Sequence, residues 1–330
     1  MKIEFNWINL SKVIGLYLMI LGHGNMVGDN IKYFIYSFHM PLFFIISGLL
    51  SRKSGGGKAV FSNNFRKLLI PYFCLNILCL LIFITYRYSI GTFHVEQLIS
   101  HINAILLGIG YETDNLEPVC TPMWFFYSLF IIKIVYSFMP KSGISIVLQL
   151  ITCFLLVKML TYYHIDTYIQ IDSAIMAYPF FLIGTMGKKK FLNFKMRPDY
   201  KNLSACFLVL LLVYYVSMFN GRCDIDTMKY GASYLLFMFT GTAASFAIMN
   251  IFKNINITCR RDIVKRISDG SSLIVGLNLL FIGVLKQTVS YILGFWNDTV
   301  GILLAILILV LFLPIISVTK KYLPFVIGYR

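Results

Sequence analysis

The chain has 330 residues and a formal net charge of +15, and 58% of its residues are hydrophobic whereas only 13% are charged. This composition excludes a water-soluble globular domain, in which charged residues make up about a quarter of the chain. The basic excess does not indicate nucleic-acid binding, because it is spread over short loops between apolar runs and forms no single basic patch.

Apolar runs long enough to cross a bilayer, which takes about 17 to 25 residues, follow one another along the chain. They predict ten spans, at residues 6–24, 31–50, 68–86, 121–139, 143–160, 171–187, 203–219, 230–252, 270–292 and 296–316. We expect an all-α, polytopic membrane protein of about ten transmembrane helices, in which residues 1–330 form a single integral-membrane domain. The first run resembles a signal peptide, but no small-residue cleavage site follows, so we expect it to be retained.

The loops after the second, sixth and eighth spans are rich in Lys and Arg, whereas the opposite loops are acidic or nearly neutral. The positive-inside rule therefore places these basic loops and both termini in the cytoplasm. The longest outer loop, residues 87–120, contains an apolar stretch at 98–107 that predicts an interfacial helix or a lid. Cys120 and Cys223 both fall on the outer side, and we favour packing over a disulfide for them. We expect a multi-pass protein of the cell membrane, either a bacterial inner membrane or a plasma membrane.

Two ionisable residues interrupt the first span, and such residues inside a membrane are functional candidates because a charge there is costly. Lys12 and His23 are eleven residues apart, which places them on one helix face about 16 Å apart along the axis. Asn9 lies on the same stripe, three residues before Lys12. The stripe predicts a polar shaft, although Lys12 and His23 snorkelling to opposite interfaces is an alternative.

The second span contains His39 two residues before Pro41. A proline inside a helix removes one backbone hydrogen bond and frees a carbonyl group that a cavity has to satisfy. This irregularity beside an imidazole indicates a site, and a histidine bonded to a neighbouring helix for packing is the alternative.

Six motifs in order along the chain resemble the membrane acyltransferase family 3, in particular its fucose 4-O-acetylase-like branch. They are Lys12 to His23, Phe38 to Phe44 with Ser47 and Gly48, Arg66 to Tyr72, Met123 to Phe126, Asp172 with Pro179 to Phe181 and Gly184, and Asn220 with Gly221 and Asp224. The resemblance implies transfer of an acyl group, usually acetyl from acetyl-CoA, to a hydroxyl of a sugar or cell-surface polysaccharide. Acetyl-CoA would act as a co-substrate, and we expect no permanently bound cofactor, no metal site and no nucleic-acid partner.

Two positions depart from the pattern of the family. Asn9 stands where the family commonly has an aspartate, and Asn278 stands where it often has a histidine. Because an amide cannot take a proton, a proton relay through either position is in doubt, and a partner-binding subunit with a decayed site stays an alternative.

The candidate catalytic residues are His23, Lys12, His39 and Asn9, with His23 as the general base because imidazole accepts a proton near neutral pH. Direct transfer is the simpler mechanism, since no Ser or Cys stands beside His23, and an acyl-enzyme stays open. The candidate donor-binding residues are Lys12, Arg66, Lys67, Lys188, Lys189 and Lys190, which we expect to bind the CoA phosphates. Topology and contact with anionic membrane lipid are the alternative roles of these loop residues.

The candidate acceptor-binding residues are Trp124, Asp172, Asn220 and Asp224, where an aromatic ring stacks on a sugar and polar groups bind its hydroxyls. Aromatic residues at this depth also serve as bilayer anchors. The alternative function from another class is a transporter or flippase of a lipid-linked sugar. It predicts internal repeats and paired broken helices, and the sequence shows neither.

Overall fold

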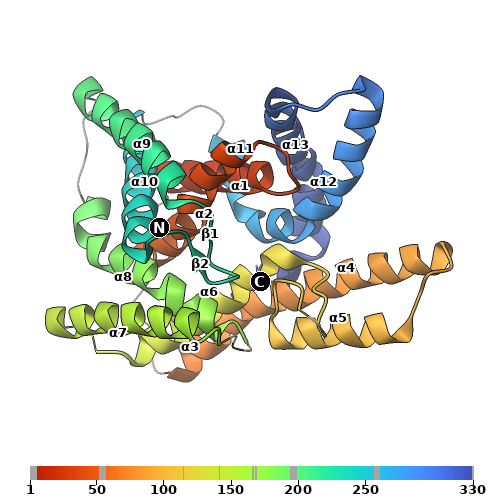
Figure 1. Cartoon of the computed structure of the whole chain (residues 1–330), viewed down its shortest axis with the longest axis horizontal. Helices are drawn as coiled ribbons and strands as arrows, with labels where there is room; N and C mark the ends of the chain where they lie inside the picture. The colour runs from red at the N-terminus through yellow and green to blue at the C-terminus, as the bar shows by residue number, and fades with distance from the viewer. Residues whose placement is uncertain are drawn as a thin grey trace.

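Each of the ten predicted apolar runs is a helix in the computed structural model (Figure 1). The structure describes residues 6–51, 57–113, 115–140, 142–165, 167, 169–193, 199–255 and 261–328. The long helices are α1 (Asn6–Gly22), α2 (Asp29–Leu49), α4 (Ile70–Ser89), α6 (Trp124–Phe138), α7 (Gly143–Tyr162), α8 (Ile171–Asn193), α9 (Tyr200–Asn220), α10 (Tyr234–Ile255), α12 (Ser271–Leu293) and α13 (Asp298–Tyr322).

Short elements connect these helices. They are α3 (Gly57–Asn64), the π-helical turn η1 (Phe65–Leu69), α5 (Val95–Leu107), the 3-10 turns η2 (Thr121–Met123) and η3 (Pro324–Ile327), α11 (Arg261–Asp269), and the strands β1 (Cys223–Asp224) and β2 (Lys229–Tyr230). The two strands form an antiparallel hairpin in which Cys223 pairs with Tyr230.

Among the described residues, eight helical stretches are long and apolar enough to cross a membrane. The first predicted span, α1, has 17 residues and is not one of the eight, and neither is α8. The prediction of an all-α, polytopic membrane protein is confirmed, with eight qualifying spans where the sequence indicated about ten.

Helix α2 packs against α1, α8, α9 and α10. Its closest neighbour is α8, and the two helices cross where a glycine of each faces the backbone of the other. A Cβ atom on Gly48 would collide with the carbonyl oxygen of Phe181, and one on Gly184 would collide with that of Ile45. Small residues at a crossing let helix backbones approach closely in lipid, and this contact fixes α2 against α8.

The apolar stretch predicted in the long outer loop is the helix α5, which lies alongside α4 (Figure 1). Tyr72 donates a hydrogen bond to the carbonyl oxygen of Ile105 (2.8 Å). The Nδ1 atom of His101 lies 2.5 Å from the carbonyl oxygen of Glu117. The helix is confirmed, and its role as a lid stays a prediction.

Cys120 and Cys223 are free, as the preference for packing over a disulfide predicted. The thiol of Cys120 donates to the carbonyl oxygen of Gly276 at 2.8 Å, and Cys223 is buried in the hairpin. Cys259 lies outside the described residues.

Candidate functional site

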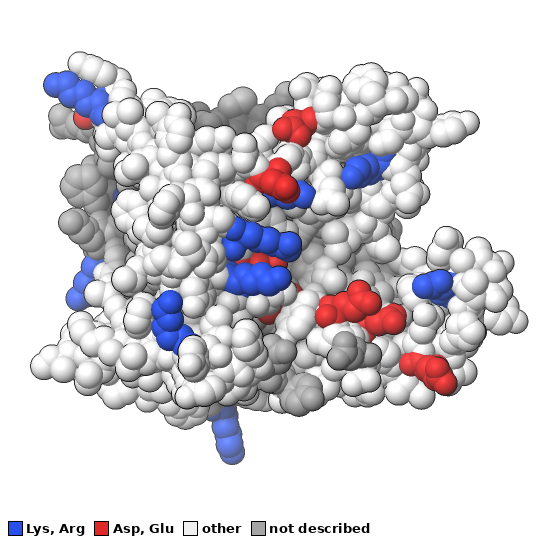
Figure 2. Space-filling model, viewed as in Figure 1, with Lys and Arg blue, Asp and Glu red and all other residues white. Residues whose placement is uncertain are grey.

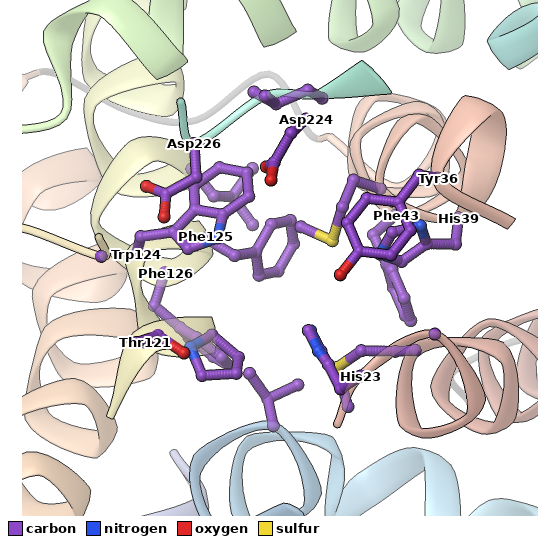
Figure 3. A pocket seen from close by; sticks show the side chains of 18 of the residues that line it. His23, Tyr36, His39, Phe43, Thr121, Trp124, Phe125, Phe126, Asp224 and Asp226 are labelled. Atoms are coloured by element: carbon purple, nitrogen blue, oxygen red, sulfur yellow. The ribbon is translucent and has the colours of Figure 1, made fainter. Parts of the chain in front are cut away.

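A cavity of about 1030 Å³ lies between α1, α2, α6 and α12 and reaches the segment that carries β1. Lys12, His23, His39, Trp124 and Asp224 line it, and they come from four separate parts of the chain. Figure 3 shows His23 and His39 on one side of the space and Trp124 on the other. The cavity therefore joins residues that the sequence assigned to three different roles.

His23 follows the last residue of α1, and its backbone N–H bonds the carbonyl oxygens of Met19 and Ile20, each at 3.2 Å. Its Nε2 atom is buried and has no hydrogen-bond partner among the described residues. The ring centroid of Tyr36 lies 6.2 Å from that of His23. His23 thus lines the cavity and has a buried imidazole nitrogen without a protein partner.

The loop after His23 is held by the α12–α13 hairpin. Gly24 and Asn25 both have positive φ, at 62° and 53°, and Lys286 donates to both of their carbonyl oxygens, at 2.8 Å and 2.9 Å. Trp296 donates to the carbonyl oxygen of Met26 at 3.2 Å. These contacts fix the end of α1 and hence the position of the His23 backbone.

The Nδ1 atom of His39 lies 2.9 Å from the carbonyl oxygen of Ile35. A carbonyl oxygen only accepts hydrogen bonds, so Nδ1 carries the proton and Nε2 is an acceptor. His39 is 3% exposed, and its ring packs edge-on against Tyr36 with centroids 5.0 Å apart. The Tyr36 ring is thus a neighbour of both histidines.

One end of the cavity is cationic, because Lys12 of α1, Lys67 of η1 and Lys133 of α6 line it. The positive charges of Lys67 and Lys12 are close enough to act electrostatically on the ammonium group of Lys133. Among the described residues, none of the three forms an ion pair within 4.0 Å. Asp269 acts on Lys12 electrostatically, but its carboxylate pairs with Lys320 at 2.9 Å. Three neighbouring cations without a bound carboxylate form a site suited to a polyanion.

The other end of the cavity contains carboxyl groups and an indole. Asp224 pairs with Arg222 at 3.5 Å, and Asp226 and Trp124 are 6% and 8% exposed. Burial raises the pKa of Asp226 well above its usual range, and the charges of Asp224 and Asp172 raise it further. Burial also raises the pKa of Asp224, against the opposing effect of Arg222. On the face that carries β1 and β2, acidic and basic side chains gather near the centre of a largely uncharged surface (Figure 2).

Two of the predicted acceptor-binding residues form hydrogen bonds with the backbone and do not line the cavity. Asp172 accepts from the backbone N–H groups of Ser173 (2.7 Å) and Thr167 (3.2 Å) at the start of α8. Asn220 donates to the carbonyl oxygen of Tyr230 at 2.8 Å and so ties α9 to the hairpin. Neither side chain lines the cavity.

Four of the remaining predicted residues also lie away from the cavity. Asn9 accepts a hydrogen bond from Ser268 of α11 at 3.0 Å, and Lys188 donates to the carbonyl oxygen of Ser51. Arg66 and Lys189 are exposed and do not line the cavity, and the side chain of Lys190 lies outside the described part of the structure.

The second position at which the chain departs from the family pattern is Asn278. It is fully buried in α12, where its Nδ2 atom donates to the carbonyl oxygen of Val275 at 2.7 Å. Its Oδ1 atom has no partner among the described residues, and the side chain does not line the cavity.

Sequence reasoning missed Lys133 and Asp226. Lys133 is an ionisable residue inside an apolar span, which is the signal that identified Lys12. Asp226 lies in a short loop with no periodic pattern, and only its spacing of two from Asp224 indicated a shared face. In the part of the chain that the structure describes, no three His, Cys, Asp or Glu side chains are grouped to hold a metal ion.

A comparison with protein families gives one match. The model of the acyltransferase 3 family, described as an acyltransferase domain, matches residues 5–319. No curated protein and no solved structure matches the chain.

Proposed function

The chain belongs to the acyltransferase 3 family of membrane acyltransferases, and from this premise we propose that it transfers an acetyl group from acetyl-CoA to a sugar hydroxyl. The acceptor is a sugar or cell-surface polysaccharide, as in the fucose 4-O-acetylase-like branch. One observation carries the proposal. A single cavity holds an imidazole nitrogen without a protein partner between a cationic end and an end with carboxyl groups and an indole.

In the proposed reaction His23 is the general base. Its Nε2 atom takes the proton of the acceptor hydroxyl while the hydroxyl oxygen attacks the thioester carbonyl carbon. A C–O bond forms, the C–S bond breaks, and the imidazolium returns the proton to the sulfur of CoA. None of the described cysteines lines the cavity, which supports direct transfer over an acyl-cysteine intermediate.

His39 acts by positioning. Its proton is held by the carbonyl group of Ile35, and its ring packs on Tyr36, which in turn faces His23. Replacing His39 would therefore loosen the wall that orients His23 without removing the base itself.

The donor enters from the cytoplasmic side, where the basic loops lie. Of the predicted donor-binding residues, Lys12 and Lys67 line the cavity, and Lys133 joins them. These ammonium groups bind the phosphates of CoA, and the thioester then extends toward His23. Arg66, Lys188 and Lys189 lie outside the cavity and serve topology and contact with anionic lipid.

The acceptor enters from the outer side of the cell membrane, where Trp124 and Asp224 line the cavity. The indole offers a flat apolar surface to a sugar ring, and the carboxylate accepts hydrogen bonds from hydroxyl groups.

The test is acyl transfer by detergent-purified protein with isotopically labelled acetyl-CoA and a panel of sugar acceptors. A general base contributes about 10² to 10⁴ in rate, so His23→Ala should lower turnover by that factor. His94→Ala is the matched control, because His94 is exposed before α5 and away from the cavity. Equal product from wild type and His23→Ala would remove His23 from the chemistry. A wild-type protein that moves a lipid-linked sugar without consuming acetyl-CoA would support the transporter alternative.

A further inference from the structure

Tyr36 of α2 presents a phenol hydroxyl group to the cavity. The residue lines the cavity, its side chain is partly buried, and Figure 3 shows the hydroxyl turned into the open space toward His23. In the described part of the chain this hydroxyl forms no hydrogen bond, and unlike the Nε2 atom of His23 it is not enclosed by the protein. The hydroxyl can therefore donate a hydrogen bond to a molecule in the cavity.

Contacts with both histidines and with the end of α1 fix the position of the Tyr36 ring. Its centroid lies 6.2 Å from that of His23 and 5.0 Å from that of His39. A Cβ atom on Gly22 would lie 3.1 Å from Cε2 of Tyr36, the ring carbon next to the one that carries the hydroxyl. Because Gly22 directly precedes His23, the hydroxyl lies beside the residue that is assigned as the general base.

Acyl transfer needs a hydrogen-bond donor near the general base. When a hydroxyl oxygen attacks a thioester, negative charge develops on the carbonyl oxygen, and a fixed donor at that position lowers the barrier. The base and this donor act on two oxygen atoms that become bonded to the same carbon, so they have to lie close to each other. A phenol is suited to this role, because it is uncharged near neutral pH and donates a hydrogen bond.

Other donors that line the cavity are placed less well for this role. Lys12 is about 16 Å from His23 along the axis of α1, too far to act on the same carbonyl group. Lys32 forms a hydrogen bond of 2.6 Å within the loop that follows α1. Thr121 and Trp124 lie across the cavity from His23 (Figure 3).

The charged groups that act on the Tyr36 phenol leave little net charge around it. They are Asp224, Arg222 and Asp226, which are close enough to act on the phenol electrostatically. Arg222 and Asp224 form an ion pair at 3.5 Å, and burial raises the pKa of Asp226 well above its usual range, which favours its uncharged form. A negative oxygen beside the hydroxyl of Tyr36 is therefore not strongly repelled.

We propose that the hydroxyl of Tyr36 donates a hydrogen bond to the carbonyl oxygen of the acetyl thioester and stabilises the negative charge on this oxygen in the tetrahedral intermediate. In that intermediate the carbonyl carbon is bonded to the acceptor oxygen and to the sulfur of CoA, and the phenol keeps its proton. When the C–S bond breaks, the carbonyl group re-forms and the sulfur takes the proton from the His23 imidazolium. This inference rests on the proposed function, because it names a further catalytic residue for the same reaction.

The first measurement needs no acceptor and no turnover. Detergent-purified full-length protein is mixed with acetyl-CoA that carries a heavy carbon isotope at the thioester carbonyl, and infrared difference spectroscopy records the carbonyl band of the bound donor. A hydrogen bond to the oxygen lowers this stretching frequency, so the band in Tyr36→Phe should lie at a higher frequency than in wild type. This variant keeps the ring that contacts both histidines and loses only the hydroxyl.

The second measurement is acetyl transfer to the methyl glycosides of fucose, glucose and galactose. Loss of one such donor lowers kcat by about 10² to 10³, so Tyr36→Phe should lose kcat by that factor while KM for acetyl-CoA stays near the wild-type value. Tyr291→Phe is the control, because Tyr291 is 90% exposed near the end of α12 and away from the cavity. Tyr33→Phe removes the same atom from a second tyrosine of α2 that lines the cavity and should keep the wild-type carbonyl band.

An unmoved carbonyl band in Tyr36→Phe would overturn the inference, and so would a kcat equal to that of Tyr291→Phe. A loss confined to KM for the glycoside, or an equal shift of the band in Tyr33→Phe, would also overturn it. Tyr36→Phe should unfold near the wild-type temperature, and a large fall would contradict a hydroxyl without a protein partner. Failure of the proposed function is distinguishable, because a wild type that binds acetyl-CoA but acetylates no glycoside still gives a carbonyl band, which then decides alone.

Discussion

The ammonium group of Lys286 lies 2.8 Å from the carbonyl oxygen of Gly24, the residue that directly follows His23. It also bonds the carbonyl oxygen of Asn25 at 2.9 Å and lies over the ring of Trp296, 5.0 Å from its centroid. A residue of α12 thus fixes the loop that ends the α1 helix, and the position of the proposed base depends on a side chain that does not line the cavity.

Lys286→Met should therefore impair catalysis through geometry. The substitution removes two charge-assisted hydrogen bonds, and a misplacement of His23 of about 1 Å is enough to lower kcat about a hundredfold. We expect kcat to fall while the affinity for CoA stays near the wild-type value, and Lys286→Arg should restore part of kcat because it keeps the donors. Steady-state kinetics with varied acetyl-CoA test this, with Lys201→Met at the exposed start of α9 as control. A kcat equal to that of the control would contradict the positioning role.

The cationic end of the cavity predicts opposite effects on stability and on donor binding. Lys133→Met removes one of three neighbouring positive charges, so the ligand-free protein should unfold at a higher temperature because repulsion is relieved. The same variant should bind CoA roughly tenfold or more weakly, since charge-assisted hydrogen bonds to phosphate are lost. Thermal unfolding and isothermal titration measure the two effects, with Lys189→Met as the control off the cavity. Unchanged CoA affinity in Lys133→Met would remove this lysine from the donor site.

The Asp226 carboxyl predicts a dependence of stability on pH. Burial raises its pKa well above its usual range, with Asp224 and Asp172 raising it further and the nearby side chain of Gln170 opposing them. Because the folded state holds the proton of Asp226 more tightly than the unfolded state does, the protonated carboxyl contributes to the free energy of unfolding. This contribution is fully present below the ordinary pKa of about 3.9 and is lost as pH rises through the raised pKa of the folded state. Asp226→Asn should remove that loss, so the difference in unfolding temperature between variant and wild type should grow with pH. A difference that is constant between pH 4 and pH 9 would show that Asp226 titrates normally.

The topology inferred from the basic loops is tested by cysteine labelling in intact cells. In a background without the native cysteines, Asn63→Cys lies on the exposed face of α3 near a basic loop, and Thr92→Cys is exposed between α4 and α5. A membrane-impermeant maleimide should label Thr92→Cys and leave Asn63→Cys unmodified until the cells are permeabilised. The reverse pattern would invert the orientation and place the donor side outside.

The helices could be predicted from the sequence because each run is predominantly apolar, and in lipid such a segment has to satisfy its backbone hydrogen bonds as a helix. The same reasoning found α5, where Leu98 to Leu107 is apolar between polar flanks. Helix ends were less certain, because charged residues such as those at the end of α8 can continue a helix into the aqueous phase.

The site could be predicted where polar residues interrupt an apolar helix face, as Lys12, His23 and His39 do. It could not be predicted at helix ends, because a polar side chain there can form a hydrogen bond with the backbone of a cap or turn as readily as with a ligand. Asp172 and Asn220 stand at such ends and bond the backbone there. The spacing of residues also says nothing about which loop folds back over a cavity, and this is why Asp226 emerged only from the structure.

The glycine crossing of α2 and α8 has a consequence for how a large substrate gains access. Because the backbones of Gly48 and Gly184 touch the neighbouring helix directly, α2 cannot slide along α8 without a collision. The wall of the cavity that carries His39 and Tyr36 is therefore held in a fixed position. If the acceptor is a polysaccharide, as proposed, widening the cavity for its chain end falls to the opposite wall, which α12 and residues 110–112 form.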